Sequence, residues 1–549
     1  MFSAFASLAP LATTGPPPKD VPPPTPLNLP QCNPQLPGST GSPSNQDHPS
    51  LVRFLQTLHR PTEVNESHFA ALGVHVHVDA PAEYVIPDSS CLPSASGWDG
   101  IDLDEARRRD HTFRMPLSNG RMSPEARVYL ERRDELSIAN QAAFRTVRRF
   151  KPEPGRPAVR LGNCYEFFRQ LEFMATYWDD TSLPPSQDEA TEQEQESQTR
   201  RTPQRTTYRT APGSQMPAEL RHNLVSAFVK LVSYDFGCNM APPRVEPRLH
   251  LVEPPSAKSK QKNGSATQRS SYFSSGCVFI YRTPITREAA RAGIVEGPIA
   301  AVSARNTTNF TKPTESSIDF GRELIAALVT AQLRAREGKV EKRIGQGQWW
   351  ATVKRWGGAE GGPIGREIEG DAIVGDKDAF DTENPGEGGP SADAPSPSVD
   401  KPTVQEPGYP RVVPVRGAPL SKRPRKTLSV YDRYRMVRLP SSNWDKKARY
   451  EAIGKIKGAD FDDVFVVSSL FHHLSVLRVR VPDRLLQVLG GAEEEGPGRY
   501  SWDKLEIWRS TWFDLFVPEQ RLEAMRLLWG MMAWSMRKTD GADEAMKDA

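Results

Sequence analysis

Apolar residues recur at helical spacing in several separate stretches of the chain. The pattern predicts helices over 164–178, 217–234 and 316–337. The first of these stretches is apolar on more than one face, which is typical of a helix buried in a core. The positions that carry the three predictions are Phe168, Leu171, Ala175, Trp178, Leu220, Leu224, Phe228, Leu231, Leu324, Leu328 and Ala331.

Two longer stretches also have helical period. Residues 124–150 predict one helix that begins at Pro124, where a proline suits the first turn. The C-terminal stretch predicts two helices, one on each side of Pro518, packed as an antiparallel hairpin in a core. The alternative for this pair is an exposed groove that receives a partner. The positions that carry the hairpin are Leu505, Trp508, Trp512, Leu515, Leu522, Met525, Trp529, Met532 and Met536.

Strand patterns are fewer than helical ones. Cys277–Tyr281 and Ile299–Ser303 are short apolar runs rich in β-branched residues, with prolines near their ends. His75–Val78 and Leu477–Val481 alternate strictly between apolar and polar residues, which predicts strands with one polar side.

Four stretches have too few large apolar side chains to form a core: 1–48, 181–215, 252–271 and 357–421. Ordering a backbone costs about 1–2 kcal/mol per residue, so we predict that they are disordered. The predicted fold class is therefore α+β and helix-rich, with an ordered core built from islands separated by long disordered linkers. The predicted regions are a Pro-rich tail (1–48), a partly ordered N-terminal region (49–156) with a helix near 124–150, a first core part (157–356) interrupted at 181–215 and 252–271, a linker (357–421), a basic tract with a C-terminal helical part (422–538) and a tail (539–549).

Composition narrows the class of protein. The 50 prolines among 549 residues are roughly twice the usual share and collect where no helix or sheet forms. The net charge of +3 argues against a uniformly basic surface. The five cysteines are scattered, with no Cys-x-x-Cys pair, which fits reduced thiols. No apolar run is long enough for a bilayer, and the first residues lack a basic segment, so we expect an intracellular protein, nuclear or cytoplasmic, neither secreted nor membrane-bound.

Histidines supply the sharpest polar pattern. On a strand, His75, His77 and Asp79 project to the same side and could present two imidazoles and a carboxylate to a metal. The residues that accompany such a His-x-His pair in cupins and in metal-dependent amidohydrolases are missing here. We therefore expect surface or half-buried strand histidines with no metal and no cofactor. His472 and His473 are also adjacent, and on a helix their side chains would diverge by about 100°.

The tract 422–457 is the strongest candidate for binding a macromolecule, because basic residues alternate in it with aromatic ones. Such a mixture suits phosphates and bases. The candidate nucleic-acid-binding residues are Arg433, Arg435, Arg438, Lys446, Lys447, Arg449, Tyr434 and Trp444. The cluster Lys422, Arg423, Arg425 and Lys426 also fits a nuclear localisation signal. A charged, solvated surface is the alternative for the whole tract.

Three stretches resemble parts of an uncharacterised filamentous-fungal protein family of unknown function. They are GNCYEFFRQLEFMATYWDD, YRTPITREAARAGIVEGPIAAV and GQGQWWATVKRWGG. The resemblance implies a shared fold across linkers of variable length, and it implies no activity or functional residue.

No catalytic motif is complete in the sequence. We therefore expect a non-enzymatic interaction or scaffold protein with a protein partner. The alternatives are a nucleic-acid-associated protein that uses residues 422–457, and an enzyme whose site is assembled from distant residues. A continuous basic face would favour nucleic acid, and a pocket that gathers His, Asp and Arg would favour the enzyme.

Overall fold

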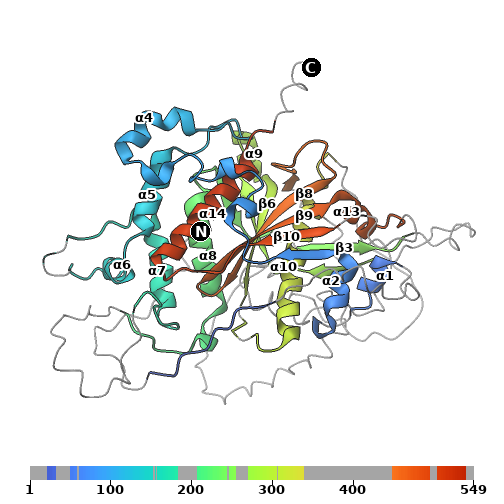
Figure 1. Ribbon diagram of the computed structural model, residues 1–549, viewed down its shortest axis with the longest axis horizontal. Helices are drawn as coiled ribbons and strands as arrows, with labels where there is room; N and C mark the ends of the chain where they lie inside the picture. The colour runs from blue at the N-terminus through green and yellow to red at the C-terminus, as the bar shows by residue number, and fades with distance from the viewer. Residues whose placement is uncertain are drawn as a thin grey trace, which may run out of the picture.

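The described residues form helices and a mixed β-sheet, which confirms the predicted α+β class (Figure 1). The computed structural model describes residues 21–31, 50–58, 61–152, 155, 157–183, 207–243, 247–254, 270–305, 307–308, 310–338, 448–494, 502 and 504–539.

The main sheet has nine strands, with β1-β10-β9-β8-β6-β5-β2 as its central order, β11 beside β9 and β7 beside β6. The pairs β1–β10, β6–β7 and β6–β8 are parallel, and the other pairs of this sheet are antiparallel. A separate hairpin pairs β3 with β4. The strands are β1 Val74–His77, β2 Cys238–Ala241, β3 Arg248–Val252, β4 Ser270–Ser274, β5 Val278–Arg282, β6 Val295–Arg305, β7 Ala448–Tyr450, β8 Phe461–Leu470, β9 His473–Pro482, β10 Leu505–Arg509 and β11 Phe513–Asp514.

Helices cover both faces of the main sheet, with α14 and α8 on one side and α10 on the other (Figure 1). The α-helices are α1 Leu51–Leu55, α2 Glu66–Leu72, α3 Ala82–Val85, α4 Leu103–Phe113, α5 Ala126–Leu136, α6 Asn140–Val147, α7 Tyr165–Met174, α8 Ala218–Ser233, α9 Arg287–Ala292, α10 Pro313–Arg334, α13 Asp483–Leu489 and α14 Pro518–Met536. Short 3-10 turns are η1 Pro61–Glu63, η2 Ser89–Cys91, η3 Trp98–Gly100, η4 Gly162–Cys164 and η5 Gly213–Gln215.

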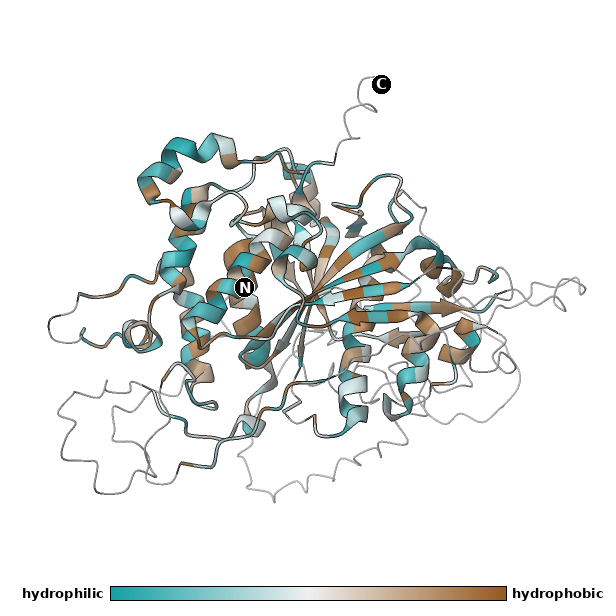
Figure 2. Cartoon of the chain, in the orientation of Figure 1, coloured by the Kyte–Doolittle hydropathy of each residue, from teal (hydrophilic) through white to brown (hydrophobic). Residues whose placement is uncertain are grey.

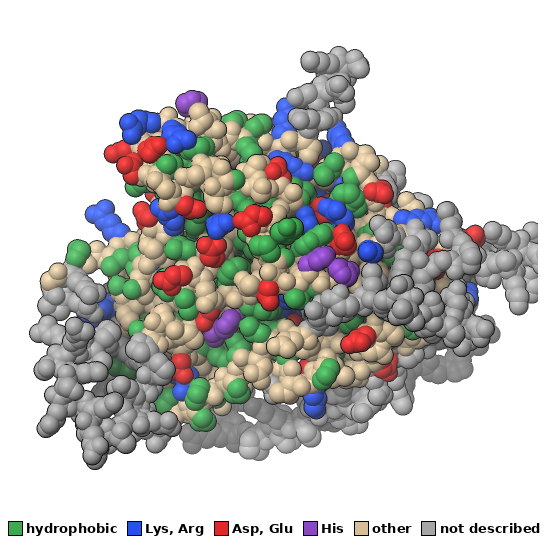
Figure 3. Space-filling view, in the orientation of Figure 1, with side chains coloured by type: hydrophobic (Ala, Val, Ile, Leu, Met, Phe, Trp, Pro, Cys, Tyr) green, Lys and Arg blue, Asp and Glu red, His purple; other side chains and the backbone are tan. Residues whose placement is uncertain are grey.

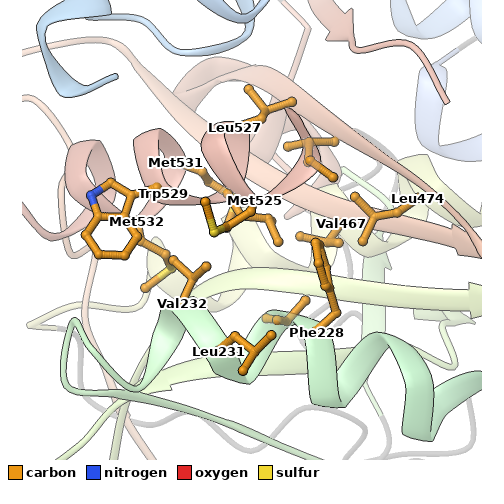
Figure 4. Close-up of a cluster of buried hydrophobic side chains, with 14 of the residues drawn as sticks. Phe228, Leu231, Val232, Val467, Leu474, Met525, Leu527, Trp529, Met531 and Met532 are labelled. Carbon is orange, nitrogen blue, oxygen red and sulfur yellow. The ribbon is translucent and has the colours of Figure 1, made fainter. Parts of the chain in front are cut away.

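Each face of the sheet has its own hydrophobic core. Successive side chains of β8 point to opposite faces, so Phe465 enters the core under α14 and α8, whereas Val466 enters the core under α10. A strand covered on both sides has apolar residues that face both ways, as residues 464–467 do within β8. Figure 2 shows apolar residues along the central strands, with polar ones between them. Figure 4 shows part of the first core, where Met525, Trp529 and Met532 of α14 face the side of α8 that carries Phe228, Leu231 and Val232.

Most elements predicted from hydrophobic spacing are present. The stretches 164–178, 217–234 and 316–337 contain α7, α8 and most of α10, which begins three residues before the predicted start. The alternating and β-branched runs are strands β1, β5, β6 and β9. The second helix of the predicted C-terminal hairpin is α14, and it is buried in the core.

The first helix of that hairpin was predicted wrongly. Leu505–Arg509 is strand β10, inserted between β1 and β9. Leu505 and Ile507 face the core under α10, while Glu506 and Trp508 point to the other face. The spacing of Leu505 and Trp508 fits a helix as well as a strand, and pairing with two distant strands decides between them.

The predicted single helix over 124–150 is also wrong. The chain forms α5 and α6 with a break after Leu136. The buried guanidinium of Arg521, on α14, donates from Nε to the Leu136 carbonyl at 2.6 Å and from Nη2 to the Ile138 carbonyl. These carbonyls therefore bond to Arg521 rather than to a continuing helix.

Parts of the predicted linkers lie among the described residues. Residues 207–215 lie against the end of the α7 region, where the Thr210 amide donates to the Thr176 carbonyl at 2.8 Å. Ser270 and Ser271, in the predicted linker 252–271, belong to β4. Leu27, in the predicted N-terminal tail, packs against the core under α14. Residues 184–206, 255–269 and 339–447 lie outside the described residues.

Candidate functional site

His75 and His77 project from β1, the edge strand next to β10. The parallel pairing places His75 beside Glu506 and His77 beside Trp508. Because Val74 and Val76 fill the core under α10, the two histidines face the opposite side of the sheet. The pairing thus adds a carboxylate to the histidine pair, and it comes from a strand far along the chain.

The three side chains are close enough to share a ligand. The His75 Nδ1 and the His77 Nε2 are 3.2 Å apart, and one ligand atom from each of His75, His77 and Glu506 lies within 4.8 Å of the others. All three residues are half-buried. Asp79, the carboxylate suggested by the sequence, follows the end of β1 with φ of 50° and is not part of this cluster.

An aromatic ring and an arginine support the cluster from the side. The ring of His77 stacks on Trp508, with centroids 5.4 Å apart and planes 13° apart. The guanidinium of Arg478 lies over the same indole, 3.6 Å from its centroid. Burial lowers the pKa of His77, and the neighbouring His75 lowers it further. The stack on Trp508 also fixes the orientation of the His77 imidazole.

The carboxylate of Glu506 is not engaged by Arg480, the neighbouring cation on β9, because Arg480 binds another carboxylate. Arg480 is paired with Glu506 in register, yet its guanidinium donates to both carboxylate oxygens of Asp463, each at 3.1 Å. Glu506 makes no hydrogen bond or ion pair with another side chain in the described part of the protein.

His472 and His473 form a second cluster, and the prediction that their side chains diverge is wrong. They lie at the turn between β8 and β9 rather than on a helix, and their ring centroids are 4.3 Å apart. Asp514 approaches His473 at 3.9 Å, but it already accepts from Thr181 Oγ1 at 2.5 Å and from the Phe516 amide at 2.9 Å. His472 is buried against aromatic rings, and burial lowers its pKa well below the usual value. This cluster is part of the packing of the turn.

A cluster of deeply buried charges lies between α10 and the sheet. Glu323 accepts from Arg305 Nη2 at 3.1 Å and from Arg509, and Arg305 Nε lies 2.5 Å from Asp319. Burial raises the pKa of Asp319. For Glu323, burial acts in the same direction, but Arg509 and Arg305 outweigh it and hold the pKa below its usual value. Two cations and two carboxyl groups here neutralise one another, so the cluster anchors α10.

Buried thiols offer no nucleophile. Cys91, Cys164, Cys238 and Cys277 are buried and unbridged. Burial raises the pKa of Cys91 to about 11, so the thiol stays protonated at neutral pH.

The candidate nucleic-acid residues fall mostly outside the described residues. This applies to Arg433, Arg435, Arg438, Lys446, Lys447, Tyr434 and Trp444, and to the localisation cluster Lys422, Arg423, Arg425 and Lys426. Arg449 is described: it lies on β7, 2.6 Å from Glu451 and 3.9 Å from Glu296. Its charge is therefore balanced locally. On the face shown in Figure 3, the described acidic and basic side chains are intermixed, with no continuous basic surface.

Two hollows of about 520 and 480 Å³ lie beside α4 and α5. Charged side chains line both, and several pair locally, as Arg107 does with Asp104 at 3.1 Å and Arg127 with Glu131 at 2.8 Å. Neither hollow is lined by a histidine.

Comparison of the chain with family models, with curated proteins and with solved structures finds no match. Among the described residues, no helix combines the length and apolar character needed to cross a bilayer.

Proposed function

We propose that the protein is a non-enzymatic interaction or scaffold protein, in which a rigid core holds three long inserted segments for partner proteins. The observation that carries this proposal is that, on either side of each of the segments 184–206, 255–269 and 339–447, the described chain leaves and re-enters the core at adjacent points. We call each such pair of adjacent points a neck.

The neck around 339–447 is the most firmly held. Arg334, at the end of α10, is fully buried and donates from Nη2 to the Ile453 carbonyl at 2.8 Å. Its guanidinium also binds both carboxylate oxygens of Asp462, at 2.7 and 3.0 Å. The guanidinium of Arg336 lies over the ring of Tyr450, 4.7 Å from its centroid. The chain on each side of the segment is thus joined directly.

The other two necks are closed by backbone pairing and side-chain bonds. Val252 of β3 is paired with Ser270 of β4, so the segment 255–269 joins two adjacent strand ends. After 184–206, Thr207 Oγ1 donates to Glu172 at 3.3 Å and Arg209 Nε donates to Asp179 at 2.9 Å. Both acceptors lie on or just after α7.

A closed neck supports the scaffold role, because the two ends of the inserted segment are already joined and the core is complete without that segment. Long insertions at such points cost little stability, since the entropy of loop closure grows slowly with length. Residues 357–421 are rich in Gly, Pro and acidic side chains, a composition suited to short peptide motifs read by partners. The buried charges described above supply structural pairs rather than a reactive group.

Proximity labelling in cells tests this proposal. The full chain is compared with a variant in which 339–447 is replaced by a short Gly-Ser linker between Gly338 and Ala448. A matched control replaces 184–206 in the same way. We expect the first variant to lose a defined set of labelled proteins that the control retains, while the circular dichroism spectra of both stay like that of the full chain. An identical set of labelled proteins for the full chain and for a variant without all three segments would contradict the proposal.

A further inference from the structure

We propose that His75, His77 and Glu506 form a binding site for a divalent transition-metal ion of the zinc class. This inference is independent of the role of the inserted segments, because all its residues belong to β1 and β10 of the core.

The spacing of the three side chains fits such an ion. Zinc–nitrogen and zinc–oxygen bonds of about 2.0–2.2 Å at tetrahedral angles hold ligand atoms roughly 3.5 Å apart. The two imidazole nitrogens are 3.2 Å apart, and all three ligand atoms lie within 4.8 Å of one another. The Glu506 side chain is half-buried, and rotation about its χ angles, between staggered rotamers, can bring its oxygen nearer to the two imidazole nitrogens.

The chemistry of the ligands favours zinc over magnesium or calcium. Two imidazoles and one carboxylate suit zinc and the neighbouring transition metals, whereas magnesium and calcium prefer oxygen ligands alone. Three protein ligands leave a fourth position for water or an outside group. Since all three residues are half-buried, solvent can reach that position.

The described neighbouring residues fix the positions of the three ligand side chains without forming hydrogen bonds to their ligand atoms. Trp508 stacks on His77, and the strand pairing fixes His75 beside Glu506. Arg480 is bound by Asp463 and leaves Glu506 without an ion pair to a described residue. Arg478, over Trp508, brings a positive charge close to the site and opposes a cation. The single carboxylate of Glu506 offsets that charge, so we expect its loss to weaken binding strongly.

The test uses the full chain, freed of metal by a chelator that is then removed, and titrated with zinc in equilibrium dialysis. Cobalt substitution adds a second readout, because Co²⁺ in a four-coordinate site with imidazole ligands absorbs visible light. We expect one zinc per chain and at least a 100-fold weaker affinity in His77→Ala and in Glu506→Gln. Glu506→Gln keeps the size of the side chain, so a loss of affinity with an unchanged circular dichroism spectrum is not a folding defect.

Two matched controls separate this site from other histidines. His111→Ala removes an exposed histidine on α4, and His473→Ala removes one member of the second cluster. Both variants are expected to bind zinc as the native chain does. Binding that is absent in the native chain at micromolar zinc, that survives His77→Ala and Glu506→Gln, or that is lost in His473→Ala instead, would overturn the assignment.

Discussion

Single charged residues in the interior join parts of the chain that are far apart in sequence. Arg521 is the clearest example, because its guanidinium reaches the Leu136 carbonyl at the end of α5 and the Ile138 carbonyl before α6, 385 and 383 positions earlier. It also donates to the Asn140 side chain at 2.5 Å. Burial lowers the pKa of Arg521 to about 10, so it remains a cation at neutral pH. These bonds join α14 to the break between α5 and α6, beside the apolar packing of the same helices.

Replacing Arg521 with methionine keeps an unbranched side chain that reaches as far as the Nε position but removes every donor. The buried Leu136 carbonyl and the partly buried Ile138 carbonyl would then lose this partner, and a fully buried carbonyl without a partner costs about 1–3 kcal/mol. We expect the free energy of unfolding, measured by denaturant titration, to fall by about 3 kcal/mol. Arg526→Met on the same helix is the control, because its pairs with Glu523 and Glu83 lie at the surface and are worth under about 1 kcal/mol. Equal losses in the two variants would show that the Arg521 bonds do not hold the helices.

A buried histidine makes stability depend on pH. Burial, with a smaller effect from Arg221, lowers the pKa of His222 to about 3, while the unfolded chain titrates near 6.5. Between these values only the unfolded chain takes up the proton, so stability present above pH 6.5 is lost as the pH falls. From pH 7 to pH 5 this one group should cost about 2 kcal/mol. In His222→Gln, the fall in unfolding free energy between these pH values should be smaller by that amount, and an identical fall in both proteins would contradict the assignment.

At the scale of elements, the hydrophobic period is enough to predict a helix or strand where the segment is long and packs along one stripe or one face. This is why α7, α8, α14 and the strands β5, β6 and β9 could be predicted. It was not enough for β10, where Leu505, Trp508 and Leu515 have helical spacing by coincidence. The pairing of β10 with β1 sets Glu506 beside His75. No property of the sequence near His75 points to Glu506, so only the pairing of distant strands could reveal this third ligand.

Helix α10 is held to the sheet by Glu323, which accepts from Arg305 of β6 and Arg509 of β10. Removing one member of a buried charge cluster leaves the others uncompensated and costs about 3–5 kcal/mol. We therefore expect Glu323→Ala to lower the unfolding free energy by that amount, whereas Thr314→Ala, at an exposed position of the same helix, should change it by less than about 0.5 kcal/mol. A loss below 1 kcal/mol in Glu323→Ala would show that apolar packing alone fixes α10.

At the scale of the whole molecule, two hydrophobic cores share one sheet, and the three necks lie on that framework. The alternative role, nucleic-acid association through 422–457, makes a different prediction. Binding to phosphates should weaken by roughly 0.7–0.9 log units per contact for each tenfold rise in salt. Alanine at Arg433, Arg435 and Arg438 should then flatten this dependence. The scaffold role predicts no salt-sensitive binding of RNA or DNA by the purified chain, as measured by fluorescence anisotropy.

The central claim is that the core is complete without the segment between Gly338 and Ala448. Its most direct test is denaturant unfolding of the full chain and of the variant in which a short Gly-Ser linker replaces 339–447. Closing a loop roughly nine times shorter should raise the unfolding free energy by about 2 kcal/mol, with the same dependence on denaturant concentration. A variant that unfolds at lower denaturant, or in a shallower transition, would contradict the claim and would make the segment part of the core.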